Sequence, residues 1–150
     1  MSDPIQIWCD GSYRQEHGNI GIGWVRAVAG GDPVEHSSPL PKLKPQTKHG
    51  SDIAEYTAFA SALSGLPDGA KVHVHMDCQN VIETLNKEAL APKHRGEADL
   101  VTAFTGAVSA KKRMGAVQIS LTSDKNSPNM KLAHTLSRAA STPGKKTLKA

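Results

Sequence analysis

The stretch that decides the fold is residues 4–25, PIQIWCDGSYRQEHGNIGIGWV. Residues 5–10 alternate apolar and polar side chains, which is the period-two pattern of a half-buried strand. Residues 11–19 contain two glycines and an asparagine and predict a turn, after which residues 20–25 form a second strand beside the first. We therefore expect a hairpin with Asp10 at its open end. An aspartate at such a position usually stabilises a turn, so Asp10 becomes a candidate functional residue only if other acids lie close to it in the fold.

Length and composition limit the class of protein. The 150 residues suffice for one domain, and with 38% apolar but only 4% aromatic residues the core must use small and β-branched side chains. Two cysteines without a signal-like N-terminus favour a reducing, cytoplasmic setting. No run approaches the roughly 20 apolar residues that a membrane span needs. We expect a monomer with no membrane partner.

The net charge of +4 permits a polyanionic partner without requiring one. Basic side chains occur in four segments: Lys42, Lys44 and Lys48; Lys93 and Arg95; residues 111–113; and Lys145, Lys146 and Lys149. Spread in this way, they could follow a phosphate backbone. Surface charge that only confers solubility fits the composition equally well.

The remaining patterns predict the order β-β-β-α-β-α-α-β-α. Further strands are expected at residues 34–38, 71–77 and 116–121, and helices at 51–66, 79–86, 98–110 and 128–140, with Ser127 as an N-cap. This order predicts an α/β fold with a five-stranded mixed sheet, antiparallel in its first three strands, and helices on both faces. Residues 1–140 form the expected domain, and 141–150 a basic, disordered tail.

Two more acids stand in notable positions. Glu55 lies in the first turn of the 51–66 helix, and the residues on its side of the helix are apolar. The pattern Asp52-x-x-Glu55 is also that of a capping box, which the helix alone favours. Asp77 ends the 71–77 strand and shares the polar face of that strand, as Asp10 does in its own.

The histidines and cysteines of the strands suggest no separate chemistry. His73 and His75 have the spacing of a strand-borne metal pair, but no third ligand is evident, so partly exposed sheet-face residues are expected. Cys9 and Cys78 are expected to be small buried thiols rather than a redox pair.

Three motifs, each in the expected context, resemble those of type 1 ribonuclease H. They are Asp10-Gly11-Ser12, Asp52-Ile53-Ala54-Glu55, and Met76-Asp77-Cys78-Gln79-Asn80-Val81. The resemblance implies a ribonuclease H-like fold from about residue 4 to 140, with Asp10, Glu55 and Asp77 as catalytic carboxylates that bind two Mg²⁺ or Mn²⁺ ions. Two such ions about 4 Å apart can activate water and stabilise the attacking and leaving oxygens of a phosphodiester. A role in metal binding also explains an acid beside an apolar helix face.

The chain departs from that family at two places. His134 stands where the family has a fourth acid; imidazole is a poorer Mg²⁺ ligand, although it suits Mn²⁺ better and can shuttle protons. His134 is thus either a catalytic residue or an ordinary flank residue of its helix. In the preceding loop the family carries a mobile histidine, whereas here Asp124 either replaces the missing acid or holds the turn. The basic protrusion of some members is reduced to residues 87–95.

The resemblance implies an endonuclease that cuts the RNA strand of RNA/DNA hybrids and leaves a 3′-hydroxyl and a 5′-phosphate. Contacts to 2′-hydroxyls in the minor groove would select the hybrid. The short polar residues expected to make them are Ser12, Asn19, Ser51, Gln79 and Asn80. Two alternatives remain open: a nucleic-acid-binding module on the same fold without turnover, and a DNA nuclease or recombination enzyme of the wider superfamily.

Overall fold

A five-stranded sheet forms the centre of the computed structural model, which describes residues 3–28 and 31–142. Its strands are β1 (Ile5–Arg14), β2 (Asn19–Ala27), β3 (Val34–Leu40), β4 (Lys71–Met76) and β5 (Ala116–Leu121). They lie in the order β3-β2-β1-β4-β5. The pairs β1–β2 and β2–β3 are antiparallel, while β1–β4 and β4–β5 are parallel. The mixed α/β sheet predicted from the sequence is confirmed.

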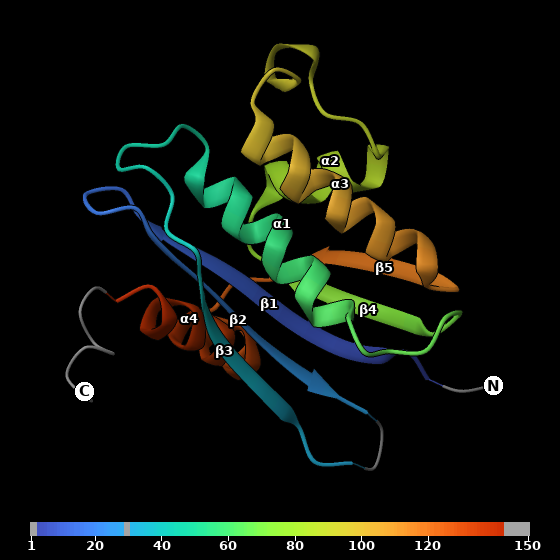
Figure 1. Cartoon of the computed structure of the whole chain (residues 1–150). Helices are drawn as coiled ribbons and strands as arrows, with labels where there is room; N and C mark the ends of the chain where they lie inside the picture. The colour runs from blue at the N-terminus through green and yellow to red at the C-terminus, as the bar shows by residue number, and fades with distance from the viewer. Residues whose placement is uncertain (1–2, 29–30, 143–150) are drawn as a thin grey trace.

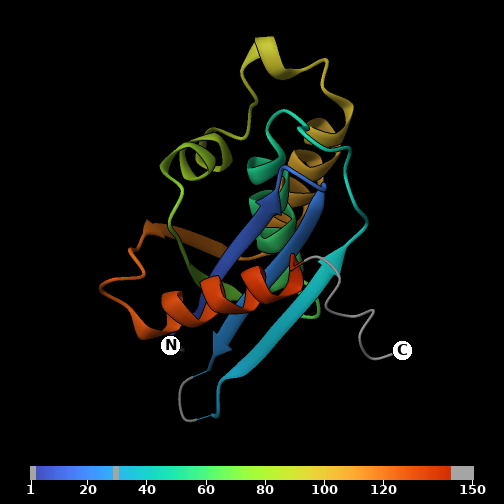
Figure 2. The same cartoon turned by 90° about the vertical axis from the view of Figure 1, so that its left-hand side faces the viewer.

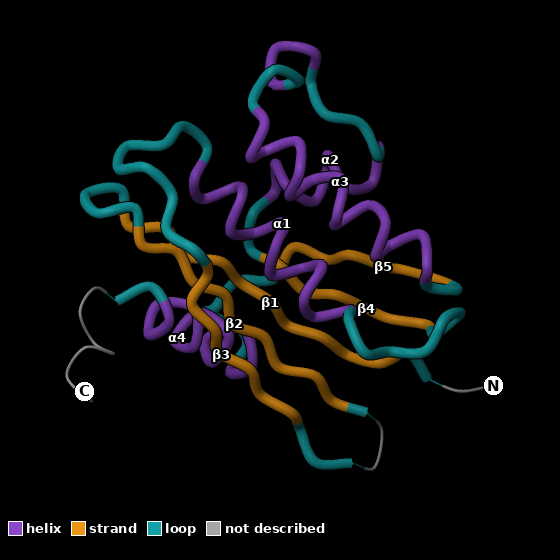
Figure 3. The backbone as a smooth tube through the Cα atoms, viewed as in Figure 1, coloured by secondary structure: helices purple, strands orange, loops and turns teal. Residues whose placement is uncertain are grey.

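Helices cover both faces of this sheet, as predicted. Helices α1 (Gly50–Leu63) and α3 (Ala98–Arg113) lie together on one face, and α4 (Pro128–Ala140) lies across β1, β2 and β3 on the other (Figures 1 and 2). The short helix α2 (Gln79–Lys87) and the 3₁₀ turn η1 (Pro92–His94) belong to the connection from β4 to α3. Figure 3 shows that the segment around η1 extends beyond the sheet.

The main core fills the space between the sheet and α1. Ile7, Cys9 and Val74 point from alternate strand positions onto Phe59 and Leu63 of α1, and all five are inaccessible to solvent. A smaller apolar cluster of Val25, Met130 and Ala133 fixes α4 to the other face. Each large side chain buried in this way contributes about 1.5–3 kcal/mol, which is enough to hold the helices at defined positions.

The observed β1 is longer than predicted. It continues through Gly11 and Ser12 to Arg14, because its ladder with β2 runs on to the pair Arg14 and Asn19. Asp10 therefore lies in the middle of a strand and not at the open end of a hairpin. Residues 11–12 favour a turn locally, but they form a strand because they pair with residues 21–22 of β2, which are small or β-branched.

Helix α1 also begins and ends differently from the prediction. It starts at Gly50, its N-cap is His49 with no side-chain capping bond, and it ends at Leu63 instead of residue 66 because Gly65 takes a positive φ of 80°. The capping-box interpretation of Glu55 is therefore wrong, since the helix N-terminus lies elsewhere. Helix α4 begins as predicted: Ser127 is its N-cap and accepts a bond of 3.1 Å from the amide of Met130.

The C-terminal boundary of the folded part differs slightly from the prediction. Ser141 is buried, and its carbonyl accepts a bond of 3.0 Å from Nε of Arg14. Ser141 and Thr142 are thus part of the folded chain, and residues 143–150 of the expected tail lie outside the described residues. Within the described residues, no helix has the length and apolarity that crossing a membrane requires.

Candidate active site

Parallel pairing of β1 with β4 brings two aspartates to the same level of the sheet. Trp8 pairs with His75, and each aspartate follows two residues later, Asp10 within β1 and Asp77 just beyond the end of β4. Asp10 is buried, whereas Asp77 is exposed. Adjacent parallel strands therefore place two carboxylates side by side, as the sequence order predicted.

Close approach of α1 to β1 adds the third acid. A Cβ atom on Gly11 would lie only 2.3 Å from the carbonyl carbon of Ala54 and 2.6 Å from the amide nitrogen of Glu55. Only glycine permits this approach, which sets the first turns of α1 directly on the strand. Glu55 is consequently buried beside Asp10.

The three acids form one compact group. Asp10, Glu55 and Asp77 each offer a carboxylate oxygen, and these oxygens lie within 4.8 Å of one another. They line a pocket of about 240 Å³. The other lining residues are Gly11, Ser12, Tyr13, Ser51, His134 and Arg138. Three hard oxygen donors at this spacing form a suitable ligand set for Mg²⁺ or Mn²⁺.

The electrostatics of the group also fit a bound cation. Burial, followed by repulsion from Asp10 and Asp77, raises the pKa of Glu55 well above its ordinary range. Burial and the charge of Asp10 raise the pKa of Asp77 to about 6, against a smaller opposing effect of His134. In addition, the Oε1 atom of Glu55 is inaccessible and has no hydrogen-bond partner. A divalent cation would satisfy this oxygen and offset the repulsion among the acids.

Helix α4 contributes two donors to Asp10. His134 Nδ1 lies 2.9 Å from Asp10 Oδ2, and the Ser137 hydroxyl donates to the same oxygen at 3.0 Å. The helix lies this close because β2 presents glycine to it: a Cβ on Gly23 would meet Ser137 N at 2.5 Å. His134 therefore contacts one of the three acids, Asp10, directly.

Asp124 lies near Asp77 but does not line the pocket of the three acids. Both residues line a separate pocket of about 310 Å³, together with Leu121, Thr122 and Ser123. The charge of Asp124 adds slightly to the raised pKa of Asp77. Asp124 is therefore a neighbour of the three-acid group, whereas His134 bonds to one of its members.

The residues expected to contact substrate are only partly gathered at the pocket. Ser51 and Ser12 line it, but Ser12 is buried and accepts a bond of 2.9 Å from the Ser141 hydroxyl. Three others, all within the described residues, lie outside the pocket: Asn19, Gln79 and Asn80. The Gln79 amide donates to Glu83 at 2.8 Å.

Sequence reasoning missed Ser137 and Arg138. Ser137 bonds to Asp10, and Arg138 brings the cationic side chain of the pocket. Ser137 lies three residues and Arg138 four residues after His134, so the helical period puts all three on one side of α4. That spacing is the signal that would have identified them once His134 was chosen.

The strand histidines are structural, as expected. Both ring nitrogens of His75 are occupied, Nδ1 by the Thr122 hydroxyl at 2.9 Å and Nε2 by Gln6 at 2.9 Å. His73 Nε2 bonds to the Ser120 hydroxyl at 2.7 Å. Burial and the neighbouring His73 lower the pKa of His75 to about 4, so its ring is neutral at pH 7.

Comparison with known proteins rests on structure alone, since no family model and no curated protein matches the sequence. RNase H1 from the halophilic archaeon Halobacterium salinarum superposes with a TM-score of 0.70 at 20% identity, covering 92% of this chain and 97% of that one. The N-terminal RNase H domain of a Mycobacterium tuberculosis protein gives 0.71 at 16% identity, covering 93% and 100%. LC11-RNase H1, solved in complex with an RNA/DNA hybrid, gives 0.64 at 22%, covering 90% and 98%. The chain therefore has the fold of type 1 ribonuclease H.

Proposed function

We propose that the protein is a metal-dependent endonuclease that hydrolyses the RNA strand of RNA/DNA hybrids. The observation that carries this proposal is the convergence of Asp10, Glu55 and Asp77 from three separate elements into one pocket. Repulsion between carboxylates at this spacing destabilises the folded protein, and such clusters of acids occur mainly at functional sites. The fold supports the same reading, because a structural neighbour was solved with a hybrid bound.

Asp10, Glu55 and Asp77 would hold the divalent ions, which we propose to be two Mg²⁺ or Mn²⁺. When bound, such ions supply an activated water and stabilise the charge that develops on the phosphodiester oxygens. The all-oxygen donor set, the unpaired buried Oε1 of Glu55 and the raised pKa of Asp77 support this assignment. Binding of a metal would require Asp77 to lose its proton.

His134 and Ser137 would act on Asp10 rather than on the substrate. Both donate to Oδ2, which fixes the rotation of the carboxylate and leaves Oδ1 to serve as a metal ligand. The His134 side chain is 41% exposed, so its ring also faces solvent at the edge of the pocket. In this proposal His134, rather than Asp124, takes the place of the fourth acid, because His134 orients the metal ligand Asp10.

Substrate contacts would come from the rim of the pocket. Arg138 is the pocket's cationic residue and would contact a backbone phosphate, while Ser51 would reach a 2′-hydroxyl. The other four proposed contacts are Ser12, Asn19, Gln79 and Asn80; of these, Ser12 would act through its backbone because its hydroxyl is engaged. We further propose that the protein is a monomer and acts in the cytoplasm. Its two free cysteines are compatible with a reducing compartment.

A panel of labelled substrates of one sequence tests the proposal. The purified protein, with Mg²⁺ and separately with Mn²⁺, is mixed with RNA/DNA hybrid, duplex DNA and duplex RNA. Cutting of only the RNA strand of the hybrid, leaving a 3′-hydroxyl and a 5′-phosphate, is expected. Binding of the hybrid without cutting would replace the proposal by a binding module, and cutting of duplex DNA would replace it by a DNA nuclease.

A further inference from the structure

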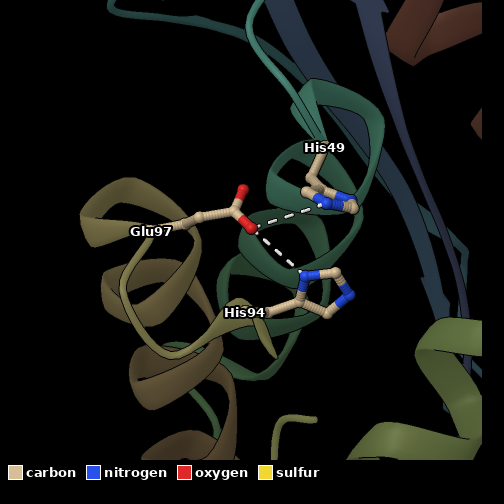
Figure 4. Close-up of side chains that lie close together, drawn as sticks. All are labelled: His49, His94 and Glu97. Atoms are coloured by element: carbon tan, nitrogen blue, oxygen red, sulfur yellow. Dashed lines mark hydrogen bonds and ion pairs between the residues drawn. The ribbon is translucent and has the colours of Figure 1, made fainter. Parts of the chain in front are cut away.

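A second group of metal-ligating side chains lies at the N-termini of α1 and α3, away from the three acids. His49 is the N-cap of α1, His94 ends η1, and Glu97 is the N-cap of α3. The ligand atoms of the three lie within 4.8 Å of one another. Figure 4 shows both imidazole rings turned toward the Glu97 carboxylate. Glu97 Oε2 lies 3.1 Å from His94 Nδ1 and 3.6 Å from His49 Nε2.

One nitrogen of this group lacks a partner. His49 Nε2 is inaccessible to solvent and makes no hydrogen bond, since its distance from Glu97 Oε2 exceeds hydrogen-bond range. Buried polar atoms are nearly always paired, because leaving one unpaired forfeits its hydration. Among the described side chains, the other buried polar atoms without a hydrogen-bond partner are Oδ1 of Asn19 and Oε1 of Glu55, the latter in the three-acid group.

The opposite nitrogen of His49 faces a second carboxylate. Asp52 Oδ2 lies 3.8 Å from His49 Nδ1. Histidines that bind metals commonly direct their other ring nitrogen at a carboxylate, which fixes the tautomer and makes the ligating nitrogen more basic. At 3.8 Å this pair is beyond hydrogen-bond range, but the Asp52 carboxylate still attracts a proton on Nδ1 and so favours the tautomer in which Nε2, the nitrogen nearer Glu97, is free to bind a metal.

We propose that His49, His94 and Glu97 bind a zinc ion, with Asp52 as the nearby carboxylate that favours the ligating tautomer of His49. Two imidazoles and one carboxylate form a ligand set that zinc takes with a fourth position left for water, and all three side chains are partly exposed. Imidazole nitrogen favours zinc and similar transition metals over Mg²⁺, whereas the three-acid group offers only oxygen. The two sites therefore select different metals.

Such an ion would join the basic connection between α2 and α3 to the start of α1, which carries two residues of the proposed nuclease. His94 and Glu97 belong to the connection that bears Lys93 and Arg95, and His49 immediately precedes the helix that bears Ser51 and Glu55. The zinc site is independent of the proposed function, because neither its ligands nor its geometry involves the three-acid pocket.

Cobalt and zinc binding to the full chain, stripped of metal with a chelator and kept in excess Mg²⁺, tests the site. Co²⁺ in a four-coordinate site with nitrogen ligands absorbs strongly in the visible range, whereas an all-oxygen octahedral site absorbs weakly. We expect one equivalent of Co²⁺ to produce the strong bands and Zn²⁺ to abolish them. Zinc at about 100 times its dissociation constant should also raise the thermal midpoint by roughly 5–10 °C.

Matched variants assign the binding to these residues. His94→Gln and Glu97→Gln should weaken Co²⁺ binding at least about 100-fold and remove the zinc-induced thermal shift. His17→Gln, which changes an exposed histidine in the β1–β2 turn, and Asp10→Asn, in the other site, should leave both unchanged. The proposal is overturned if the parent protein shows no strong cobalt bands, if the two ligand variants bind as tightly as the parent, or if Asp10→Asn abolishes binding. In those cases His49 and His94 form only ion pairs with Glu97.

Discussion

Asp10 is the residue on which the candidate active site depends most, because it contacts both the other acids and α4. It is only 3% exposed, yet it lies beside Glu55 and Asp77. A carboxylate in such a place needs donors or a cation. His134 and Ser137 supply two donors to one oxygen, and the proposed metal would satisfy the other.

Replacing His134 tests its role as a positioning residue. His134→Ala removes one donor from Asp10, so Mg²⁺ affinity and hybrid cleavage should both fall by about 10–100-fold. His134→Asn, which can still donate, should recover part of the loss. Metal titrations of cleavage measure both effects, with Lys131→Ala, an exposed change one turn earlier on α4, as the control. Equal apparent Mg²⁺ affinity in the parent and His134→Ala would refute the role.

The raised pKa of Asp77 predicts that Mg²⁺ binding depends on pH. Since that pKa is about 6, an ion that binds below this pH must displace a proton, and affinity should fall about tenfold per pH unit. Calorimetric titration from about pH 5 to about pH 8 measures the effect. An affinity that stays constant below pH 6 contradicts it.

The raised pKa of Asp77 also makes the stability of the metal-free protein depend on pH, but stability falls as the pH rises, whereas Mg²⁺ affinity increases. The folded state holds the Asp77 proton up to about pH 6, whereas the unfolded chain releases it near the ordinary value of 3.8. This contribution to stability is therefore complete below pH 4 and is lost as the pH rises through 6. Unfolding curves with and without Mg²⁺ should accordingly separate above pH 6 and converge at lower pH.

At the scale of elements, close contacts through glycine set the site's geometry. Gly11 lets α1 approach β1, and Gly23 lets α4 approach β2. A side chain at either position would move an entire helix and with it Glu55 or His134. The spacing within the candidate active site is therefore determined partly by glycines, which have no side chain to contribute to it.

A pair of glycine substitutions tests this dependence. Gly23→Ala places a methyl group 2.5 Å from Ser137 N and 2.6 Å from the Ala133 carbonyl, so it should cost about 1–3 kcal/mol and reduce cleavage. Gly106→Ala, in α3 with no atom within 4 Å of the new methyl, should stabilise the protein by about 0.5–1 kcal/mol. Urea unfolding measures both changes. Equal effects of the two substitutions would show that α4 tolerates displacement.

The sequence predicted elements well where local signals agree with packing. Ser127 and Pro128 mark the start of α4 by capping and by a fixed φ, and both signals act within one turn. The extension of β1 past Asp10 was missed because it depends on pairing with β2, which local sequence signals do not encode. Likewise His49 at a positive φ of 62° carries no local signal of a helix start.

For the whole molecule, element order fixes which strands are parallel neighbours and so brings Asp10 beside Asp77, whereas Glu55 joins them through the close contact at Gly11. The bond from His134 to Asp10 joins residues 124 positions apart and depends on how closely α4 approaches the sheet. Periodicity gives the face of a helix but not that distance. The three acids of the candidate site could therefore be predicted from their motifs and the element order, whereas the surroundings of Asp10 required the structure.

The distribution of basic residues predicts which of them bind nucleic acid. Lys111 and Lys112 pair with Glu88, and Arg113 pairs with Asp68, so these cations already have partners. Arg138 instead lines the pocket with the acids.

Arg138→Ala should weaken hybrid binding and reduce the slope of log affinity against log salt by about 1. Lys112→Ala is the matched control and should leave the slope unchanged. Binding in Ca²⁺, measured by anisotropy over a range of salt concentrations, gives both slopes. Identical slopes for Arg138→Ala and the parent would place the phosphate contacts elsewhere.

The most direct test of the proposed function compares the parent protein with Asp10→Asn on a labelled RNA/DNA hybrid, with Mg²⁺ and with Mn²⁺. The substitution keeps the shape of the side chain and removes one ligand charge from the three-acid group. We predict that the parent cuts only the RNA strand, that Asp10→Asn does not cut, and that both bind the hybrid. If the variant cuts as well as the parent, or if neither cuts with either metal, the three acids are not the catalytic centre of a ribonuclease H.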